Sequence, residues 1–257
     1  MIILILTIDI GNTNIVVGGF TDDSLTFVAR IATNANKTED EYATKLKSVL
    51  SLHNVFKTEL KGAIISSVVP PLNNVMKRAL KLAFDVDAIM VGPGIKTGIK
   101  IHCDNPASVG ADLICACVAT HFIYGSPSLI IDMGTATKIM LMDDEGAFTG
   151  ASIIPGVNIA LKALASDTAQ LPQISLEAPK SVIGKNTIDC MRSGVVFGNA
   201  SMIDGMIERY IKEVGKDLKV YGTGGLSETI LTHCNHHITI DKDLVLKGLN
   251  ILYNKNK

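Results

Sequence analysis

Apolar residues in the first half of the chain fall into short runs, separated by turn residues and by longer amphipathic stretches. Three of the runs predict strands, at residues 2–10, 15–20 and 25–31. Gly11-Asn12 and Asp22-Asp23 supply the turns between these strands. Beyond them helices are expected at residues 38–53, 70–84 and 108–122, and strands at residues 62–69 and 88–91. The expected order of the first half is therefore βββαβαβα.

The same strand order begins again at Leu129. A second set of three strands is expected at residues 129–131, 137–142 and 147–153. After this set the pattern predicts a helix at residues 155–170, an excursion punctuated by prolines at residues 171–185, further helical segments, a glycine turn at residues 222–225 and a final helix at residues 241–253. We therefore divide the chain into an N-terminal lobe, residues 1–122, and a C-terminal lobe, residues 123–257.

One short sequence motif, called the phrase below, occurs at the corresponding place in both halves. The first apolar run ends in Asp9-Ile10-Gly11-Asn12-Thr13-Asn14, and the run of the second half ends in Asp132-Met133-Gly134-Thr135-Ala136-Thr137. Each copy has an Asp, a Gly after one intervening residue, and small hydroxyl or amide residues. Two copies about half a chain apart predict a duplicated α/β fold with one carboxylate from each half facing a central cleft.

The chemistry of the phrase suits a magnesium-nucleotide. Gly11 allows a sharp turn in which backbone N–H groups point outward together, and such a nest binds phosphate oxygens. Asp9, at a strand end, can hold a hydrated Mg²⁺ ion, because Mg²⁺ keeps most of its waters and needs few carboxylates. For one copy alone, an ordinary hairpin with an Asp turn cap is the simpler interpretation. Two copies that open the same strand order favour the nucleotide site.

Composition narrows the class of protein. The 257 residues are 47% hydrophobic and 19% charged, with a formal net charge of -1, as in a compact globular protein without a basic field for nucleic acid. No apolar stretch is long enough to span a bilayer, and residues 1–10 lack the features of a signal peptide. The five cysteines are odd in number and irregularly spaced, which favours reduced thiols. We expect a cytoplasmic protein that binds neither nucleic acid nor membrane.

A strand ending in Asp-x-Gly-x-Thr, repeated in a second lobe, resembles the superfamily of sugar kinases, heat-shock 70 proteins and actin. Within it the chain is most similar to type III pantothenate kinases, and the similarity covers essentially the whole chain in the family's order. The segments that carry it are Thr7-Ile8-Asp9-Ile10-Gly11-Asn12-Thr13-Asn14, Arg30-Ile31-Ala32-Thr33, Thr38-Glu39-Asp40-Glu41-Tyr42, Ile65-Ser66-Ser67-Val68-Val69-Pro70, Asp104-Asn105-Pro106, Val109-Gly110-Ala111-Asp112, Asp132 through Thr137, Pro155-Gly156-Val157, Ala169-Gln170-Leu171-Pro172, Gly184-Lys185-Asn186-Thr187 and Thr223-Gly224-Gly225.

The resemblance implies a fold, an activity and a set of ligands. The fold would be a duplicated ribonuclease H-like, actin-like ATPase fold. The activity would be ATP-dependent phosphorylation of pantothenate to phosphopantothenate, the first step of coenzyme A synthesis. Mg²⁺ would accompany ATP, a monovalent cation (K⁺ or NH₄⁺) would also be needed, and the protein would be a homodimer.

The resemblance also implies roles for individual residues. ATP would be bound by the phosphate loop and by one residue of the second lobe: Asp9, Ile10, Gly11, Asn12, Thr13, Asn14, Ile15, Val16 and Thr135. Asp112 would be the catalytic base. Pantothenate would be contacted by Cys103, Gly110, Ala111, Asp112, Leu113 and Thr187. Asp132 would bind the potassium ion.

The position of Asp112 supports the role of base on independent grounds. It stands at the start of a predicted helix, which would orient its carboxylate and stabilise its negative charge. An alcohol that attacks a γ-phosphoryl group needs an oriented carboxylate more than a strong base, because the transition state is loose. The alternative is that Asp112 is an acid of the first helical turn that only supports the helix.

Three positions depart from the family pattern, in which Tyr, Arg and Thr stand where this chain has Cys103, Leu113 and Lys138. Arg is a natural clamp for the pantothenate carboxylate, and Leu113 cannot make that contact. Lys138 either supplies positive charge near a phosphate or is a solvated strand residue, and we favour the second interpretation. The departures leave two alternatives to an ordinary pantothenate kinase. One is a weak or inactive paralogue that binds nucleotide or pantothenate as a regulator, and the other is a kinase for another small alcohol.

Two further clusters have simpler interpretations. The segment His233 to His237 contains metal-capable groups, but its spacing matches no common zinc pattern and favours a solvated loop. Cys115 and Cys117 are two residues apart on a predicted helix and face different directions, as packing residues do.

Overall fold

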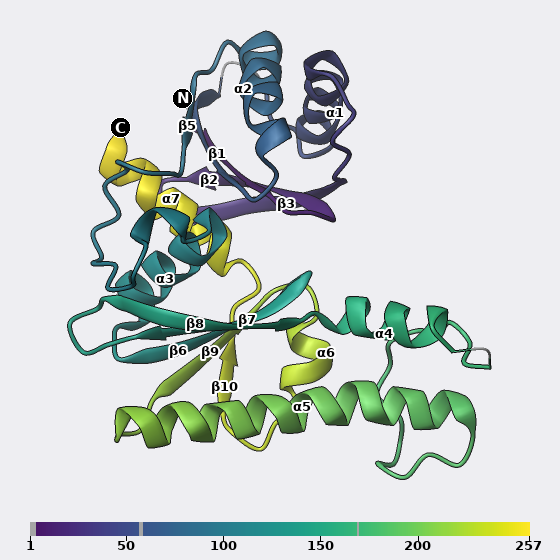
Figure 1. The fold of residues 1–257 in the computed structure, drawn as a ribbon. Coiled ribbons are helices and arrows are strands. Elements are labelled where there is room, and N and C mark those ends of the chain that lie inside the picture. Colours follow the sequence, from purple (N-terminus) through teal and green to yellow (C-terminus); the bar gives the residue numbers. More distant parts are fainter. Residues whose placement is uncertain (1–3, 57–58, 169) are drawn as a thin grey trace. The chain divides into compact units, whose positions relative to one another are not determined.

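The computed structural model describes residues 4–56, 59–168 and 170–257, and the chain divides into two compact units (Figure 1). Unit 1 consists of Met1–Tyr124 together with Leu244–Lys257, and unit 2 is Gly125–Asp243. Ile2, Ile3 and Ala169, which fall in segments predicted as a strand and a helix, lie outside the described residues. Each unit contains one five-stranded sheet.

Unit 1 follows the element order expected from the sequence. Its strands are β1 (Leu4–Ile10), β2 (Asn14–Thr21), β3 (Ser24–Ala32), β4 (Leu60–Ser67) and β5 (Ala88–Met90). Its helices are α1 (Glu39–Leu52), α2 (Pro70–Phe84), the short 3-10 helix η1 (Pro106–Ser108), α3 (Ala111–Tyr124) and α7 (Leu244–Asn256). The strand order is β3-β2-β1-β4-β5, in which β1 pairs antiparallel with β2 and parallel with β4.

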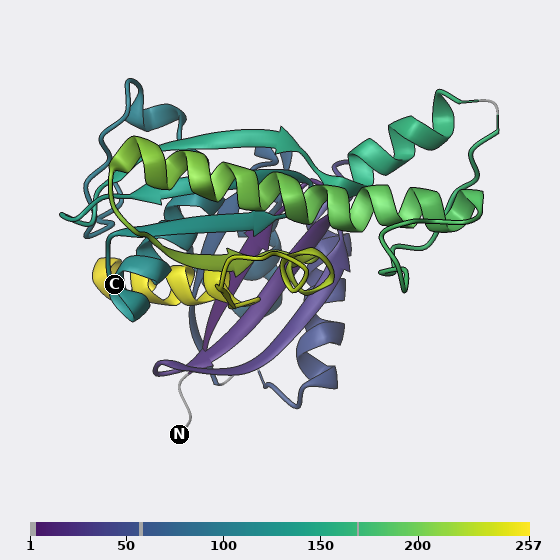
Figure 2. The same ribbon diagram turned by 90° about the horizontal axis from the view of Figure 1, so that it is seen from below.

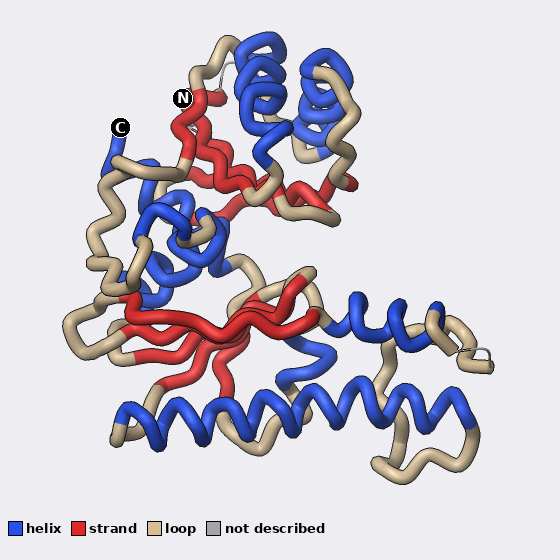
Figure 3. Tube along the Cα trace, in the orientation of Figure 1, coloured by secondary structure: helices blue, strands red, loops and turns tan. Residues whose placement is uncertain are grey.

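Helices cover both faces of the unit 1 sheet (Figure 3). Adjacent residues of β4 point to opposite faces, because side chains alternate along a strand. Ile65 packs in the core that includes Leu46 of α1 and Met76 of α2. Ile64 packs in the second core, with residues of α3 and α7 such as Val118 and Leu249. The sheet is therefore buried on both sides, which explains the nearly continuous apolar run of β4.

Unit 2 repeats the topology of unit 1. Its strands are β6 (Ser128–Met133), β7 (Ala136–Met142), β8 (Phe148–Pro155), β9 (Lys219–Thr223) and β10 (Ile238–Ile240), and its helices are α4 (Val157–Ser166), α5 (Thr187–Val214) and α6 (Ser227–Leu231). The sheet order is β10-β9-β6-β7-β8, the same arrangement as β5-β4-β1-β2-β3. This shared order confirms the predicted duplicated α/β fold.

The long helix α5 contributes many of the buried residues in the hydrophobic core of unit 2. Figure 2 shows it running roughly along the strands of the unit 2 sheet. Val196 and Ile203 of α5 are fully buried, and they pack with Leu129 and Ile131 of β6. The helix begins where the Asn186 side chain accepts a hydrogen bond from the Asp189 N–H at 2.9 Å. It ends at Gly215, whose φ of 76° is the left-handed conformation typical of a helix C-terminus.

The capping box predicted for the first helix is present in the structure. The Thr38 N–H donates to Glu41 Oε2 at 3.1 Å, and the Glu41 N–H donates to Thr38 Oγ1 at 3.4 Å. The two residues thus satisfy groups that the start of α1 leaves without helical partners.

The sequence-based boundary at residues 122 and 123 placed the last helix in the second lobe, and the structure differs there. Helix α7 belongs to unit 1, where Leu246 and Leu249 pack with Ile64 of β4. The Asn250 side-chain amide also donates to the Asp22 carbonyl, in the β2–β3 turn, at 3.0 Å. A helix at the end of the chain can return to an early domain, because its apolar face carries no information about which sheet it covers.

Two elements of unit 2 were not resolved by the sequence pattern. The helical segments expected after residue 187 form the single helix α5. Strand β10 was not predicted, because three residues are too few for a periodicity, and it pairs parallel with β9. Among the helices of the described ranges, none combines the length and the apolar character needed to cross a membrane.

Candidate active site

The turn between β1 and β2 is held by backbone hydrogen bonds that leave its polar side chains exposed. The Gly11 N–H donates to the Asn14 carbonyl at 3.0 Å, and Thr33 Oγ1 donates to the Gly11 carbonyl at 2.7 Å. Residues 12–14 are exposed. The turn is anchored to the core by the fully buried side chains of Ile10 and Ile15. The result is a turn fixed by hydrogen bonds, with exposed amide and hydroxyl side chains, and its role as a phosphate-binding nest stays a prediction.

Asp9 stands next to the last residue of β1, at the edge of this turn. It is half-buried, and the parallel pairing of β1 with β4 places Ser66 directly beside it. A half-buried carboxylate at a strand end, next to exposed polar groups, fits a hydrated Mg²⁺ ion, because such an ion needs few protein ligands. The site of this unit is therefore compatible with the magnesium-nucleotide expected from the sequence.

Helix α3 carries a carboxylate in its first turn and a buried thiol three residues later. Asp112 is half-buried in this turn, and its Oδ1 accepts a hydrogen bond from the Leu113 N–H at 3.0 Å. Cys115, three residues later and on the same side of the helix, is fully buried. Burial raises the pKa of the Cys115 thiol well above its ordinary value, and the charges of Asp9 and Asp112 raise it further. Both carboxylates predicted for chemistry in unit 1 therefore lie near one thiol.

Gly110 precedes Asp112 in a position that only glycine fits without adjustment. A Cβ atom at Gly110 would lie 2.6 Å from Asp112 Oδ1 and 3.3 Å from Leu113 Cδ1. The glycine therefore makes room for the carboxylate at the start of α3. Ala111 and Leu113 are half-buried on either side of Asp112, and Cys103 is half-buried in the loop between β5 and η1.

In unit 2 the repeated phrase carries an ion pair. Asp132 of β6 and Lys138 of β7 are directly opposite in the antiparallel pairing. Lys138 Nζ lies 2.8 Å from Asp132 Oδ2, and the two side chains are only 16% and 14% exposed. The interpretation of Lys138 as a solvated strand residue is wrong, because its ammonium group is turned inward onto the carboxylate.

Gly224, after β9, and Gly156, after β8, allow the backbone to pack closely against the β6–β7 turn. Gly224 has a φ of 93°, and a Cβ atom there would lie 2.7 Å from Asp132 Oδ1 and 2.6 Å from the Met133 backbone. A Cβ atom at Gly156 would overlap the Thr135 carbonyl. The turn that carries the exposed Thr135 is thus packed closely by the segments after β8 and β9.

The family resemblance implies a monovalent cation at Asp132, and the residues present do not fit one. The Oδ2 atom of the carboxylate is engaged by the Lys138 ammonium, and Gly224 packs tightly on the side of Oδ1. A second positive charge beside this carboxylate would be repelled by the first.

The predicted site residues fall into two sets. Unit 1 holds those of the β1–β2 turn, the first turn of α3 and Cys103, and the charges of Asp9 and Asp112 both act on Cys115 there. Unit 2 holds Asp132 and Thr135 at the β6–β7 turn, and Thr187, which is exposed at the start of α5. Sequence reasoning missed Ser66 and Cys115 as neighbours of the carboxylates. The spacing of three residues between Asp112 and Cys115 on a helix was the available signal for the thiol.

The segment His233 to His237 is a structural anchor. The backbone N–H groups of Asn235 and His236 donate to the buried carboxylate of Asp204, at distances from 2.8 to 3.1 Å. Burial raises the pKa of Cys234 to about 12, and the charge of Asp204 adds to the shift. Among the described residues no group of three or more His, Cys, Asp and Glu side chains is arranged to hold a metal ion.

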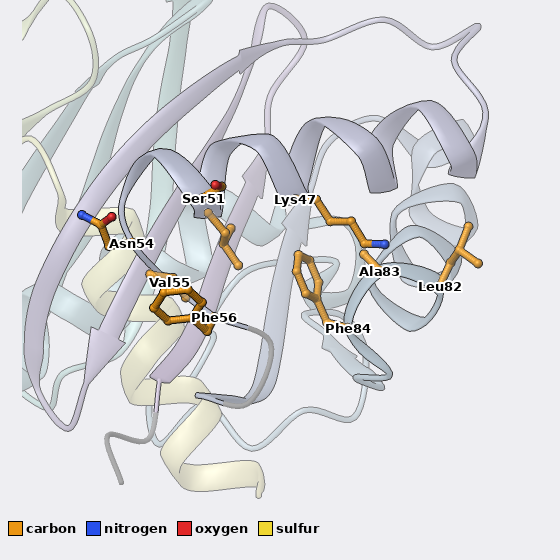
Figure 4. A pocket seen from close by; sticks show the side chains of 9 residues that line it. Lys47, Ser51, Asn54, Val55, Phe56, Leu82, Ala83 and Phe84 are labelled. Atoms are coloured by element: carbon orange, nitrogen blue, oxygen red, sulfur yellow. The ribbon is translucent and has the colours of Figure 1, made fainter.

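A surface hollow of about 430 Å³ lies where α1 and α2 end (Figure 4). Phe56 and Leu82 are among its exposed apolar residues. The described residues that line it are Lys47, Leu50, Ser51, Asn54, Val55, Phe56, Leu82, Ala83 and Phe84. None of them was predicted to bind ATP or the acceptor, so the hollow is separate from the candidate active site.

Comparison of this sequence with known proteins identifies the family to which the chain belongs. Residues 5–209 match the family described as "Type III pantothenate kinase". Over 253 residues the chain is 42% identical to a protein of that name from Halalkalibacterium halodurans, and the match covers 98% of this chain and 100% of the relative. The chain belongs to the type III pantothenate kinase family. A second type III pantothenate kinase, from Syntrophobacter fumaroxidans, is 41% identical over 255 residues, covering 99% of each chain.

The fold extends beyond the type III pantothenate kinases. A crystal structure from Sinorhizobium meliloti, described as a candidate 2-dehydro-3-deoxygalactonokinase, matches with a TM-score of 0.62 at 12% identity. The match covers 97% of this chain and 95% of the other. At this identity the likeness concerns the fold alone, and it agrees with the duplicated ribonuclease H-like fold expected from the sequence.

Proposed function

We propose that this chain transfers the γ-phosphoryl group of ATP to the primary hydroxyl of pantothenate, giving phosphopantothenate and ADP in the first step of coenzyme A synthesis. The observation that carries the proposal is the pair of half-buried carboxylates of unit 1, Asp9 near the end of β1 and Asp112 in the first turn of α3, whose charges both act on the thiol of Cys115. Membership of the kinase family supports the reaction. The positions of Asp9 and Asp112 support their proposed roles in nucleotide binding and in catalysis.

The β1–β2 turn is the proposed site for the ATP phosphates. The backbone and side chains of Asp9, Ile10, Gly11, Asn12, Thr13, Asn14, Ile15 and Val16 form or anchor this turn. Asp9 would hold the hydrated Mg²⁺ ion that accompanies ATP and neutralises phosphate charge. Thr135, exposed on the β6–β7 turn of unit 2, is the proposed contact from the second unit.

Asp112 is the proposed catalytic base. Its carboxylate would accept the hydroxyl proton as the alcohol oxygen bonds to the γ-phosphorus and the bond to the ADP oxygen breaks. Its hydrogen bond to the Leu113 N–H and the space left by Gly110 hold the carboxylate in one orientation. Orientation matters more than basicity here, because the transition state has little bond formation to the nucleophile.

The proposed acceptor site lies around the start of α3, with Cys103, Gly110, Ala111 and Leu113, and the family resemblance implies a further acceptor contact from Thr187. Leu113 favours a second candidate function, which is phosphorylation of a small alcohol without a carboxylate. An apolar side chain cannot pair with the acceptor carboxylate, and it contacts an uncharged group equally well. The retained Asp112 argues against a purely regulatory paralogue, since nucleotide binding alone needs no base.

We further propose that the enzyme is a homodimer that works in the cytoplasm, where ATP is available. Support for the dimer comes from apolar side chains exposed before and at the start of α5. Val182, Ile183 and Ile188 are 63%, 73% and 44% exposed. Exposed apolar groups that lie close in sequence are typical of interaction surfaces. Light scattering of the wild type and of Ile183→Asp, which we expect to lower the mass, tests this part.

The experiment that tests the activity offers the purified protein ATP and Mg²⁺ with pantothenate or with pantothenol, which has an alcohol in place of the carboxylate. Mass spectrometry then identifies the phosphorylated product. Phosphopantothenate supports the first function. Product from pantothenol alone supports the second candidate, and ATP binding without either product supports the regulatory alternative.

A further inference from the structure

The pair formed by Lys138 and Asp132 is built into the hairpin of unit 2. The two residues are register partners on β6 and β7, so their Cβ atoms face the same side of the sheet. The ammonium nitrogen lies 2.8 Å from Asp132 Oδ2, a normal distance for a charge-assisted hydrogen bond. The pair is therefore fixed by backbone register.

Because both side chains are largely buried, each charged group depends on the other for stability. The side chains are 16% and 14% exposed, so most of each charged group is removed from water. A buried carboxylate without a positive partner is strongly destabilising, and the same holds for a buried ammonium group. Asp132 consequently needs a cation in this place, and the chain supplies one.

The Lys138 ammonium group is the cation that the structure shows beside this carboxylate. Gly224 approaches the side of Oδ1 so closely that a methyl group there would lie 2.7 Å from the oxygen. The Lys138 ammonium engages Oδ2. A primary ammonium group has the charge of K⁺ and the donor chemistry of NH₄⁺, and it is tethered here by its own side chain.

We propose that the Lys138 ammonium group is a built-in monovalent cation, which neutralises Asp132 in place of a K⁺ or NH₄⁺ ion and makes this kinase independent of added monovalent cations. The part of the proposal that concerns turnover rests on the proposed function. The part that concerns the carboxylate rests on the ion pair alone. In this account Lys138 is a positioning residue, because it acts on the β6–β7 turn through Asp132.

The test compares the wild type with Lys138→Thr, in which Asp132 loses its ammonium partner. Lys219→Thr is the matched control, because Lys219 is an exposed strand residue of the same unit. Each protein is studied in KCl and in choline chloride at equal ionic strength, with Rb⁺ binding measured by equilibrium dialysis and thermal unfolding measured without nucleotide. We expect Rb⁺ binding and a K⁺-dependent rise in Tm for Lys138→Thr only.

Turnover gives a second readout. Wild type and Lys219→Thr should phosphorylate the acceptor at equal rates in both salts, and Lys138→Thr should lose at least about tenfold in choline chloride and recover with K⁺ or NH₄⁺. Stoichiometric Rb⁺ binding by the wild type, or activation of the wild type by K⁺, would overturn the proposal. Both of these results are obtained on the unmodified chain and do not depend on whether the variant folds. If no acceptor is phosphorylated in any salt, the proposed function fails, while the dialysis and unfolding results still decide the role of Lys138.

Discussion

The thiol of Cys115 is buried one helical turn after Asp112, and the charges of Asp112 and of Asp9 both act on it. The proposed base of α3 and the Asp9 carboxylate of β1 therefore influence the same thiol, which belongs to the core that includes Ile64 of β4. A thiolate there would be desolvated and close to two carboxylates, so the folded protein keeps the group protonated.

We expect this arrangement to lower the free energy of unfolding at alkaline pH. The folded-state pKa of Cys115 is raised, so above about pH 9 the unfolded chain loses a proton that the folded protein retains. The stabilisation is fully present below the unfolded-state pKa and is lost as pH rises toward the folded-state pKa.

Urea unfolding between about pH 7 and pH 10 measures this loss. The decline should be smaller in Cys115→Ala than in wild type, and unchanged in Cys190→Ala, which alters an exposed cysteine. Parallel pH profiles for wild type and Cys115→Ala would contradict the expectation.

Asp112→Asn should lower kcat by about 10²- to 10⁴-fold, the usual contribution of a positioned acid–base group. The amide is isosteric and cannot accept the hydroxyl proton. ATP affinity should stay within about threefold of wild type, because the proposed phosphate loop is untouched. Asp40→Asn, at an exposed acid in the first turn of α1, is the control and should retain activity. Normal turnover in Asp112→Asn would show that the base is another residue.

Gly224→Ala and Gly225→Ala form a matched pair at the glycine turn. The first places a methyl group 2.7 Å from Asp132 Oδ1 at a φ of 93°, and the second meets no atom within 4 Å. We expect a loss of about 1–3 kcal/mol in the free energy of unfolding for Gly224→Ala only, from strain in the turn. ATP affinity should fall in the same variant, because Thr135 lies on the turn that Gly224 packs against. Equal behaviour of the two variants in urea unfolding and nucleotide titration would argue against this packing role.

Leu113→Arg should raise kcat/KM for pantothenate by about tenfold or more, since a charged hydrogen bond to a carboxylate contributes about 1.5–3 kcal/mol. The same variant should gain nothing with pantothenol, which lacks the carboxylate. Steady-state kinetics with the two acceptors measures the difference. An equal gain with both would assign the effect to packing at the start of α3.

The order of elements along the chain could be predicted, because alternation and turn residues are local patterns. The repeated motif can be read directly from the sequence. Alternation and turn residues located β1 to β3 and β6 to β8, and the duplication followed from their repetition. The pairing of Lys138 with Asp132 was out of reach, because it depends on the register of a hairpin whose turn residues, 134–136, do not fix it. The return of α7 to unit 1 was missed for a related reason. Its apolar residues predicted a helix, and only tertiary packing decides that they meet α3 and β4.

The fate of the γ-phosphoryl group decides whether this chain phosphorylates pantothenate. ATP labelled at the γ position is mixed with the wild-type protein, Mg²⁺ and pantothenate, and the products are separated and counted. We expect label in phosphopantothenate, formed with one ADP for each phosphoryl group transferred. Tight ATP binding with all label left in ATP, or released only as inorganic phosphate, would contradict this expectation.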